Sequence, residues 1–152
     1  MSRNPPLPYD PFSKPARARG ARILAIQAIY QTSYSGAPYN ETALQFHHDH
    51  MKRAQGRKID KNLFDSILTL LQDHQSSIQE TLDDCLQPKW HMARLEKVLQ
   101  AILLAGAAEA HLRITPTAIL INEYVQITQG FFQQDQDKLV HAVLDCVCKK
   151  IR

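Results

Sequence analysis

Apolar residues recur at helical spacing between Asp60 and Pro88, and this pattern constrains the fold more than any other feature of the chain. They follow one another at intervals of three and four residues, as Leu63, Phe64, Ile67, Leu68, Leu71, Ile78, Leu82 and Cys85. Such spacing places them on one face of a helix. Asp60 is a good residue to cap the start of that helix, and Pro88 cannot continue it. The segment therefore predicts a long amphipathic helix.

Five further segments favour helices, and no segment shows the period-two alternation of a strand. The expected helices span residues 16–33, a stretch that begins after Asn40 and fades towards Gly56, about 93–112, 116–129 with a stop at Gly130, and a last segment that starts at Asp135 or Asp137. The second of these segments carries Leu44, His47, His48 and Met51 at the helical spacing of an apolar stripe. The expected inward residues of the later segments are Leu95, Val98, Leu99, Ile102, Leu103, Leu139, Val140, Val143, Leu144 and Val147. Small residues at 105–108 predict a close approach of another helix, and Trp90 is expected to anchor the core. The sequence predicts an all-α fold.

Length and composition allow one domain or two closely packed subdomains. The chain has 152 residues, 44% of them apolar, which is enough to build a core. Residues 1–15 hold five of the eight prolines and lack apolar periodicity, so we expect a disordered arm there.

Three cysteines, Cys85, Cys146 and Cys148, are poor material for a disulfide framework. Cys146 and Cys148 would point about 200° apart on a helix. We expect free thiols and a cytoplasmic protein. No apolar run approaches the roughly 18 residues that a membrane helix needs, and no signal peptide is recognisable at the start.

Three arginines, Arg17, Arg19 and Arg22, stand at the start of the first expected helix. Together with Lys14 they bring four positive charges, against a net charge of +3 for the whole chain. Cations are disfavoured beside the unsatisfied amides of a helix start, by roughly 0.3–1 kcal/mol each. The cluster suits a polyanion such as RNA. The alternative is that these are ordinary surface charges that frame a core helix.

Other polar clusters give weaker indications. His47, His48 and His50 would bring at most two imidazoles together on a helix, so we expect solvent-facing or interface histidines and no metal site. No phosphate-binding glycine loop or nucleophile motif is present, and neither an enzyme nor a cofactor is expected. Phe131 and Phe132 follow Gly130 in a polar stretch; one ring caps the core, or the pair forms a stacking platform. Asn122 and Glu123 interrupt an apolar helix, which favours a structural role.

Several of these segments together resemble the NusB family of bacterial transcription antitermination factors, most of all its alphaproteobacterial members. The similar segments are residues 17–31 (RARGARILAIQAIYQ), Trp90 with Arg94-Leu95 and Ala101-Ile102-Leu103, residues 116–127 (PTAILINEYVQI), Phe131-Phe132 and residues 138–145 (KLVHAVLD). The resemblance covers about residues 16–151. It implies an all-α fold of two packed helical subdomains, an N-terminal one over 16–88 and a C-terminal one over 89–152, with about six to seven helices and no enzymatic activity.

The resemblance also implies partners. Members of the family bind boxA RNA and pair with NusE, the ribosomal small-subunit protein. The heterodimer joins the RNA polymerase elongation complex on ribosomal RNA operons, and some members form a homodimer when unbound. Carried over to this chain, the RNA-facing residues are Arg17, Arg19, Arg22, Gln27, Tyr30, Phe131, Asp135, Lys138 and Leu139.

This chain departs from the family pattern at three places. Ala18 and Gly20 stand where arginines are common, Leu104 also replaces a frequent arginine, and residues 139–142 (LVHA) replace the usual Phe-Val-Asn-Gly. Two rival functions follow. One is a protein-interaction module that has lost RNA recognition. The other is the RNA-binding half of a ribosomal RNA cytosine methyltransferase. The sequence to Arg152 is expected to leave no room for the catalytic domain of such an enzyme, which argues against this alternative.

Overall fold

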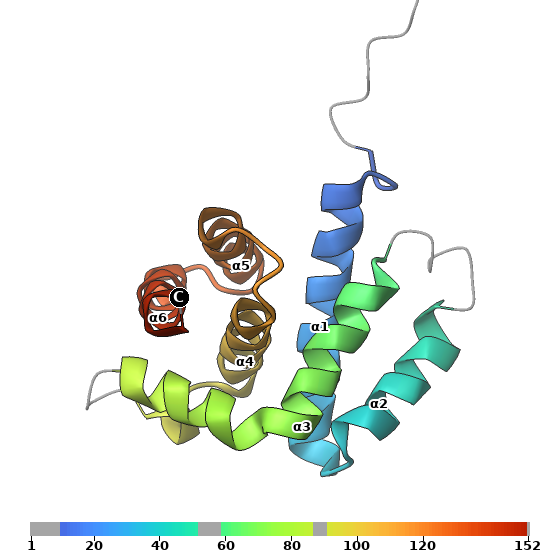
Figure 1. Cartoon of the computed structure of the whole chain (residues 1–152), viewed down its shortest axis with the longest axis horizontal. Coiled ribbons are helices and arrows are strands. Elements are labelled where there is room, and N and C mark those ends of the chain that lie inside the picture. The colour runs from blue at the N-terminus through green and yellow to red at the C-terminus, as the bar shows by residue number, and fades with distance from the viewer. Residues whose placement is uncertain (1–9, 52–58, 87–90, 152) are drawn as a thin grey trace, which may run out of the picture.

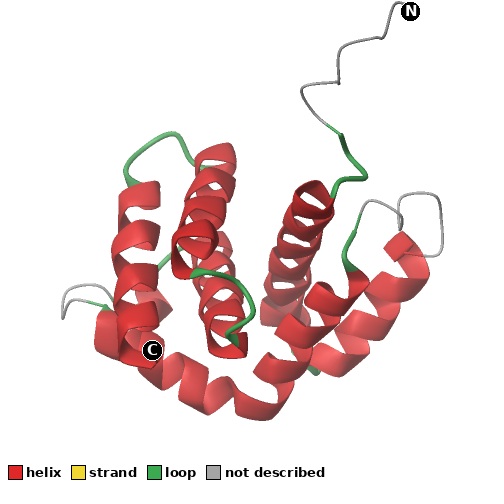
Figure 2. Cartoon of the chain, turned by 45° about the horizontal axis from the view of Figure 1, so that its top comes forward, coloured by secondary structure: helices red, strands yellow, loops and turns green. Residues whose placement is uncertain are grey.

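The computed structural model describes residues 10–51, 59–86 and 91–151. Over these residues the chain forms six α-helices and no strand (Figure 2). The helices are α1 (Lys14–Ser35), α2 (Tyr39–Phe46), α3 (Lys61–Cys85), α4 (Lys97–Leu112), α5 (Thr117–Phe131) and α6 (Gln136–Ile151). A π-helical turn, His47–Met51, extends α2, and a 3-10 turn, Met92–Arg94, precedes α4. The all-α prediction is confirmed.

Local chemistry sets both ends of α1. The Ser13 hydroxyl accepts a hydrogen bond from the amide of Ala16, and Pro15 occupies the first turn, where no intrahelical amide bond is lost. At the other end Gly36 adopts the left-handed conformation, with φ of 73°, and donates its amide to the carbonyl of Thr32. A glycine is favoured there because it has no Cβ to clash.

Helix α3 confirms the predicted apolar stripe. The Asp60 carboxylate accepts from the amide of Leu63 at 3.1 Å, and the apolar residues of the stripe are buried from Leu63 to Leu82. The backbone leaves helical geometry at His74, with φ of −134°. Beyond this kink α3 runs past the ends of α4 and α6 (Figure 1), so that one helix contacts both halves of the chain. It ends at Cys85, and Pro88 lies outside the described residues.

Helix α4 lies at the centre of the molecule, with α1, α3, α5 and α6 packed around it (Figure 1). Every residue from Ala101 to Ala110 is buried, which is typical of a helix surrounded by others. A Cβ placed on Gly106 would lie 2.9 Å from the methyl carbons of Leu144 on α6. The predicted close approach at the small residues is therefore confirmed, and a larger residue at Gly106 would force the Leu144 side chain to move.

Several expected details are wrong. The helix expected from residue 93 is broken, because Leu95 and Glu96 have extended backbone before α4 begins. Gly130 does not stop α5, which continues through Phe131. In α2, Leu44 faces solvent with 72% of its surface exposed, because Tyr39 and Phe46 take the inward positions. The expected anchor, Trp90, lies outside the described residues.

The prediction of free thiols is wrong for two of the three cysteines. Cys85, at the end of α3, and Cys146, on α6, form a disulfide with a Cα–Cα distance of 5.7 Å. Cys148, two residues after Cys146 on α6, is buried and is not part of this bond. The two bonded cysteines are separated by 61 residues, so only the packing of α3 on α6 brings them together.

A single cluster of buried apolar residues runs through all six helices. Helices α1, α2 and the first half of α3 lie on one side of it, and α4, α5 and α6 lie on the other (Figure 1). The expected boundary between subdomains, at residues 88 and 89, falls in a segment that the structure does not describe. The expected arm at 1–15 is described only from Asp10 onward. The division at 15 and at 88 stays a prediction.

Candidate nucleic-acid interface

The first two arginines of the cluster are accessible. Arg17 is exposed in the first turn of α1. Arg19 is tied to α5: its Nε donates to the carboxylate of Glu123 at 2.7 Å, and its Nη2 donates to the amide oxygen of Gln126 at 2.6 Å. Its side chain stays 41% exposed, whereas that of Glu123 is 14% exposed. These contacts hold the guanidinium at the seam between α1 and α5, with part of its forked donor set turned to solvent.

Arg22 is buried, and the expectation that it contacts RNA is corrected. Only 4% of the residue is exposed, and its Nε and Nη2 each donate to one carboxylate oxygen of Glu109 at 2.8 Å. Such a two-point ion pair is strong when both oxygens are also satisfied by other donors. Arg22 is thus a residue of the core, one helical turn away from the exposed arginines.

Two more donors complete the shell of Glu109. The hydroxyl of Tyr124 donates to one oxygen at 2.9 Å, and that of Thr115 donates to the other at 2.7 Å. Burial and then the charge of Glu109 raise the pKa of Tyr124 well above its ordinary value of 10. Burial lowers the pKa of Arg22, but the hydrogen bond and charge of Glu109 outweigh it, so the pKa of Arg22 is raised. The network holds α1, α4 and α5 together through fully paired charges.

Further along α1, Gln27 and Tyr30 lie at different depths. Gln27 is exposed, and Tyr30 is half-buried with its ring 5.0 Å from that of Tyr34 in an edge-to-face contact. Tyr30 follows Arg19 by eleven residues, which places the two within about 20° of each other around the helix. Arg19 and Tyr30, two members of the predicted RNA-facing set, therefore lie on the same face of α1.

The second part of the predicted surface lies where α5 passes into α6. Phe131 is 47% exposed at the end of α5, whereas Phe132 packs against the core, so the two adjacent rings have different surroundings. Asp135 and Lys138 are exposed and lie 3.4 Å apart as an ion pair, and Leu139 is half-buried. Both parts involve α5: Gln126, a partner of Arg19, precedes Phe131 by five residues, which is about 7.5 Å along the helix axis and about 140° around it.

Sequence reasoning missed three acidic or amide partners of the arginines. Glu109 is the one acidic residue in the otherwise apolar stretch of α4, and this was the signal available in the sequence. In the structure it is fully buried. Glu123 was recognised only as half of a polar pair with Asn122; it is Glu123 that binds Arg19, while Asn122 is exposed. Gln126 carried no signal, because a single glutamine on a helix is unremarkable.

The remaining clusters do not add a chemical site. His47 contacts the carboxylate of Asp65, and His48 contacts that of Asp49. Within the described ranges, no three residues among His, Cys, Asp and Glu come together in a way that would hold a metal ion. None of the helices in these ranges is both long and apolar enough to cross a membrane.

Comparisons with known proteins add independent findings. The model of the NusB family matches residues 19–149. The transcription antitermination protein NusB of Bartonella quintana is 38% identical over 143 residues, which span 90% of this chain and 92% of that protein. The protein of the same name from Agrobacterium fabrum is 35% identical over 151 residues, spanning 95% of this chain and 92% of that protein.

Solved structures share the fold. T. maritima NusB superposes with a TM-score of 0.67 at 18% identity, covering 87% of this chain and 90% of the other. A chain from the crystal structure of the antitermination factors NusB and NusE in complex with dsRNA superposes equally well at 20% identity, covering 87% of this chain and 96% of the other. At these identities the likeness concerns the arrangement of helices.

Proposed function

The chain belongs to the NusB family, and from this membership we propose that it is a transcription antitermination factor. The proposed activity is binding of boxA-like single-stranded RNA together with NusE, followed by entry into the RNA polymerase elongation complex on ribosomal RNA operons. The observation that carries the proposal is the 38% identity to a protein named for antitermination, over nine-tenths of both chains. The site of action is the cytoplasm, where transcription takes place, and no catalytic role is proposed.

The proposed RNA contacts divide into phosphate and base contacts. Arg17, Arg19 and Lys138 supply exposed positive charge for phosphates. Exposed Phe131 offers a ring on which a base stacks, and Asp135 offers acceptors for the amino groups of bases. Gln27, Tyr30 and Leu139 complete the proposed set. Arg22 is left out because its guanidinium is buried against Glu109.

The electrostatics of this surface favour joint binding with NusE. Glu123 neutralises part of the charge of Arg19, and Asp135 does the same for Lys138. Ala18 and Gly20 add no charge between the arginines. Because each lost phosphate contact lowers affinity and flattens its salt dependence, the chain alone is expected to bind RNA weakly. A solved structure contains the antitermination factors NusB and NusE in complex with dsRNA, which supports NusE as the partner.

Fluorescence anisotropy with labelled boxA RNA tests the proposal. The chain is titrated alone and with NusE, against boxA RNA and against a scrambled sequence of equal length. We expect preferential binding of boxA RNA and a marked gain of affinity when NusE is present. Equal affinity for both RNAs would refute the proposal, and binding of NusE without any binding of RNA would select the protein-interaction module instead.

A further inference from the structure

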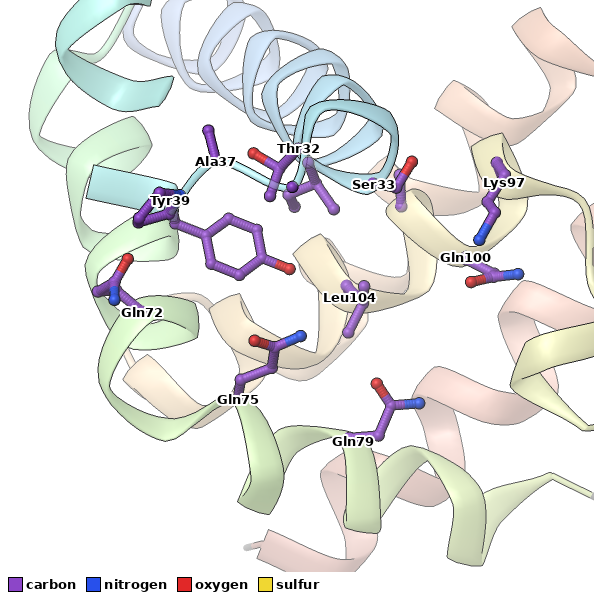
Figure 3. Close-up of a pocket in the computed structure, with 14 residues that line it drawn as sticks. Thr32, Ser33, Ala37, Tyr39, Gln72, Gln75, Gln79, Lys97, Gln100 and Leu104 are labelled. Carbon is purple, nitrogen blue, oxygen red and sulfur yellow. The ribbon is translucent and has the colours of Figure 1, made fainter. Parts of the chain in front are cut away.

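A second polar site lies away from the proposed RNA surface. A cavity of about 360 Å³ opens where the end of α1, the start of α2, the middle of α3 and the first turns of α4 meet (Figure 3). None of the proposed RNA contacts is among its described lining residues. The cavity therefore needs its own account.

Tyr39 places its hydroxyl in this cavity. The residue is only 7% exposed, and its hydroxyl points into the cavity towards Leu104 (Figure 3). Among the described residues the hydroxyl has no hydrogen-bond partner. Burial raises the pKa of Tyr39, so the hydroxyl stays protonated at neutral pH and both donates and accepts. In the cavity the hydroxyl is therefore available to a ligand both as a donor and as an acceptor.

Glutamine amides stand around the same space. Gln75 and Gln79 are four residues apart on α3 and therefore share one face of that helix. Gln100 reaches in from α4; its Nε2 donates to the carbonyl of Leu95 at 2.7 Å, which leaves its amide oxygen as an acceptor. Figure 3 shows these side chains arranged around Leu104. The amides of Gln75 and Gln79 each present a donor and an acceptor side by side, which is the pattern that a nucleobase edge matches.

Charge is confined to one end of the cavity. Lys97 carries the one charge among the described lining residues, and it precedes Leu104 by seven residues, about 10 Å along α4. A ligand with an ammonium group finds no carboxylate in this lining. A neutral sugar would leave both Lys97 and the apolar side chains of Ile29 and Leu104 unused. The lining instead suits a ligand with a flat, hydrogen-bonding ring at one end and an anion at the other.

We propose that this cavity binds an adenine nucleotide unit, with the base between Tyr39 and the glutamines and the phosphate at Lys97. Glutamine pairs with adenine through two hydrogen bonds, to N6 and N7, and uracil lacks that edge. Leu104 and Ile29 supply apolar contact to the faces of the base. The lysine binds the phosphate as a point charge. The nucleotide is either free in solution or part of an RNA chain, and both sources present the same chemistry.

Isothermal titration of the full chain with AMP, adenosine and UMP tests the assignment. AMP is expected to bind at least about tenfold more tightly than UMP. Tyr39→Phe should weaken AMP binding about fivefold or more, because it removes only the hydroxyl. Gln75→Met should weaken it as well, and Lys97→Met should reduce the affinity for AMP to that for adenosine.

Matched controls use residues outside the cavity. Tyr34→Phe changes a 67% exposed tyrosine, and Lys149→Met changes an exposed lysine of α6; neither should alter AMP binding. Arg19→Ala should leave AMP binding unchanged too, which separates this site from the proposed RNA surface. Circular dichroism melting confirms that each variant is folded.

A parallel arm with RNA separates the two sources. The chain is titrated with an oligoadenylate and an oligouridylate of equal length. If the oligoadenylate binds in a manner that depends on Tyr39 and Lys97 while AMP does not, the nucleotide belongs to an RNA chain and the assignment holds. If neither AMP nor oligoadenylate binding responds to Tyr39→Phe, Gln75→Met and Lys97→Met, the assignment is overturned.

Discussion

Arg19 and Arg22 lie less than one turn apart on α1, yet their surroundings are opposite. The side chain of Arg19 is 41% exposed and bound to α5 at the surface, whereas that of Arg22 is 5% exposed and bound to a carboxylate that solvent does not reach. In the sequence the two look alike, since both belong to one basic run ahead of an apolar helix. An arginine therefore lies at the surface at position 19 and in the core three residues later.

The difference shows that arginines of one basic cluster contribute differently to stability. Removing a surface charge costs little stability, because solvent already screens it. Removing one partner of a buried pair strands the other charge in the core, which costs far more. Helix α5 takes part in both, because Glu123 binds Arg19 while Tyr124 binds the partner of Arg22. The buried network thus holds α1 and α5 in the relative position in which Arg19 reaches Glu123.

The largest effect is expected from Arg22→Met. The substitution leaves Glu109 buried without its cation and should lower the free energy of unfolding by about 3–5 kcal/mol. Urea denaturation measures this change. Arg17→Met is the matched control and should change the free energy by no more than about 0.5 kcal/mol. Adding Glu109→Leu to Arg22→Met should recover part of the loss, and a loss below that of the control would place Arg22 at the surface.

The buried network also predicts a pH dependence. The pKa of Tyr124 is raised in the folded state, first by burial and then by Glu109, so the folded chain holds this proton more tightly than the unfolded chain. Its contribution is complete below the ordinary pKa of 10 and is lost as pH rises above 10. Stability should fall there by up to about 1.4 kcal/mol per pH unit from this group. Urea denaturation from pH 8 upward should show a shallower fall in Tyr124→Phe, and identical slopes would exclude Tyr124 as the group.

The exposed surface can be strengthened at α6. Leu139 is half-buried on the proposed RNA surface, and a leucine cannot stack on a base. Leu139→Phe should tighten RNA binding by about 1 kcal/mol, the lower end of the range for base stacking. Leu44→Phe, at a 72% exposed leucine of α2, is the control. Anisotropy titration measures both, and an equal gain in the control would mean that added apolar surface alone is responsible.

Helical periodicity was enough to predict most of the fold, since each stripe depends only on neighbours within two turns. It predicted the buried face of α3 and the close packing at Gly106, where small residues stand in a row. It missed the break before α4, because the extended backbone at Leu95 and Glu96 carries no proline or glycine signal.

The candidate sites were less predictable, because their partners are distant in sequence. Arg22 meets Glu109 across 87 residues and Cys85 meets Cys146 across 61, and no local pattern encodes either pairing. The Tyr39 hydroxyl and the glutamines line one cavity only because α1, α2, α3 and α4 meet there. Sequence reasoning found the basic cluster, and only packing distinguished its surface members from its buried one.

The most direct measurement is the salt dependence of boxA RNA binding by the Arg17→Ala, Arg19→Ala double variant in the presence of NusE. Loss of two phosphate contacts should flatten the slope of log affinity against log salt concentration by about 1.4, at roughly 0.7 per contact for single strands. The free energy of unfolding, measured by urea denaturation on the same samples, should stay within about 1 kcal/mol of the parent. An unchanged slope, with or without a loss of stability, would contradict the account that the exposed arginines hold the RNA.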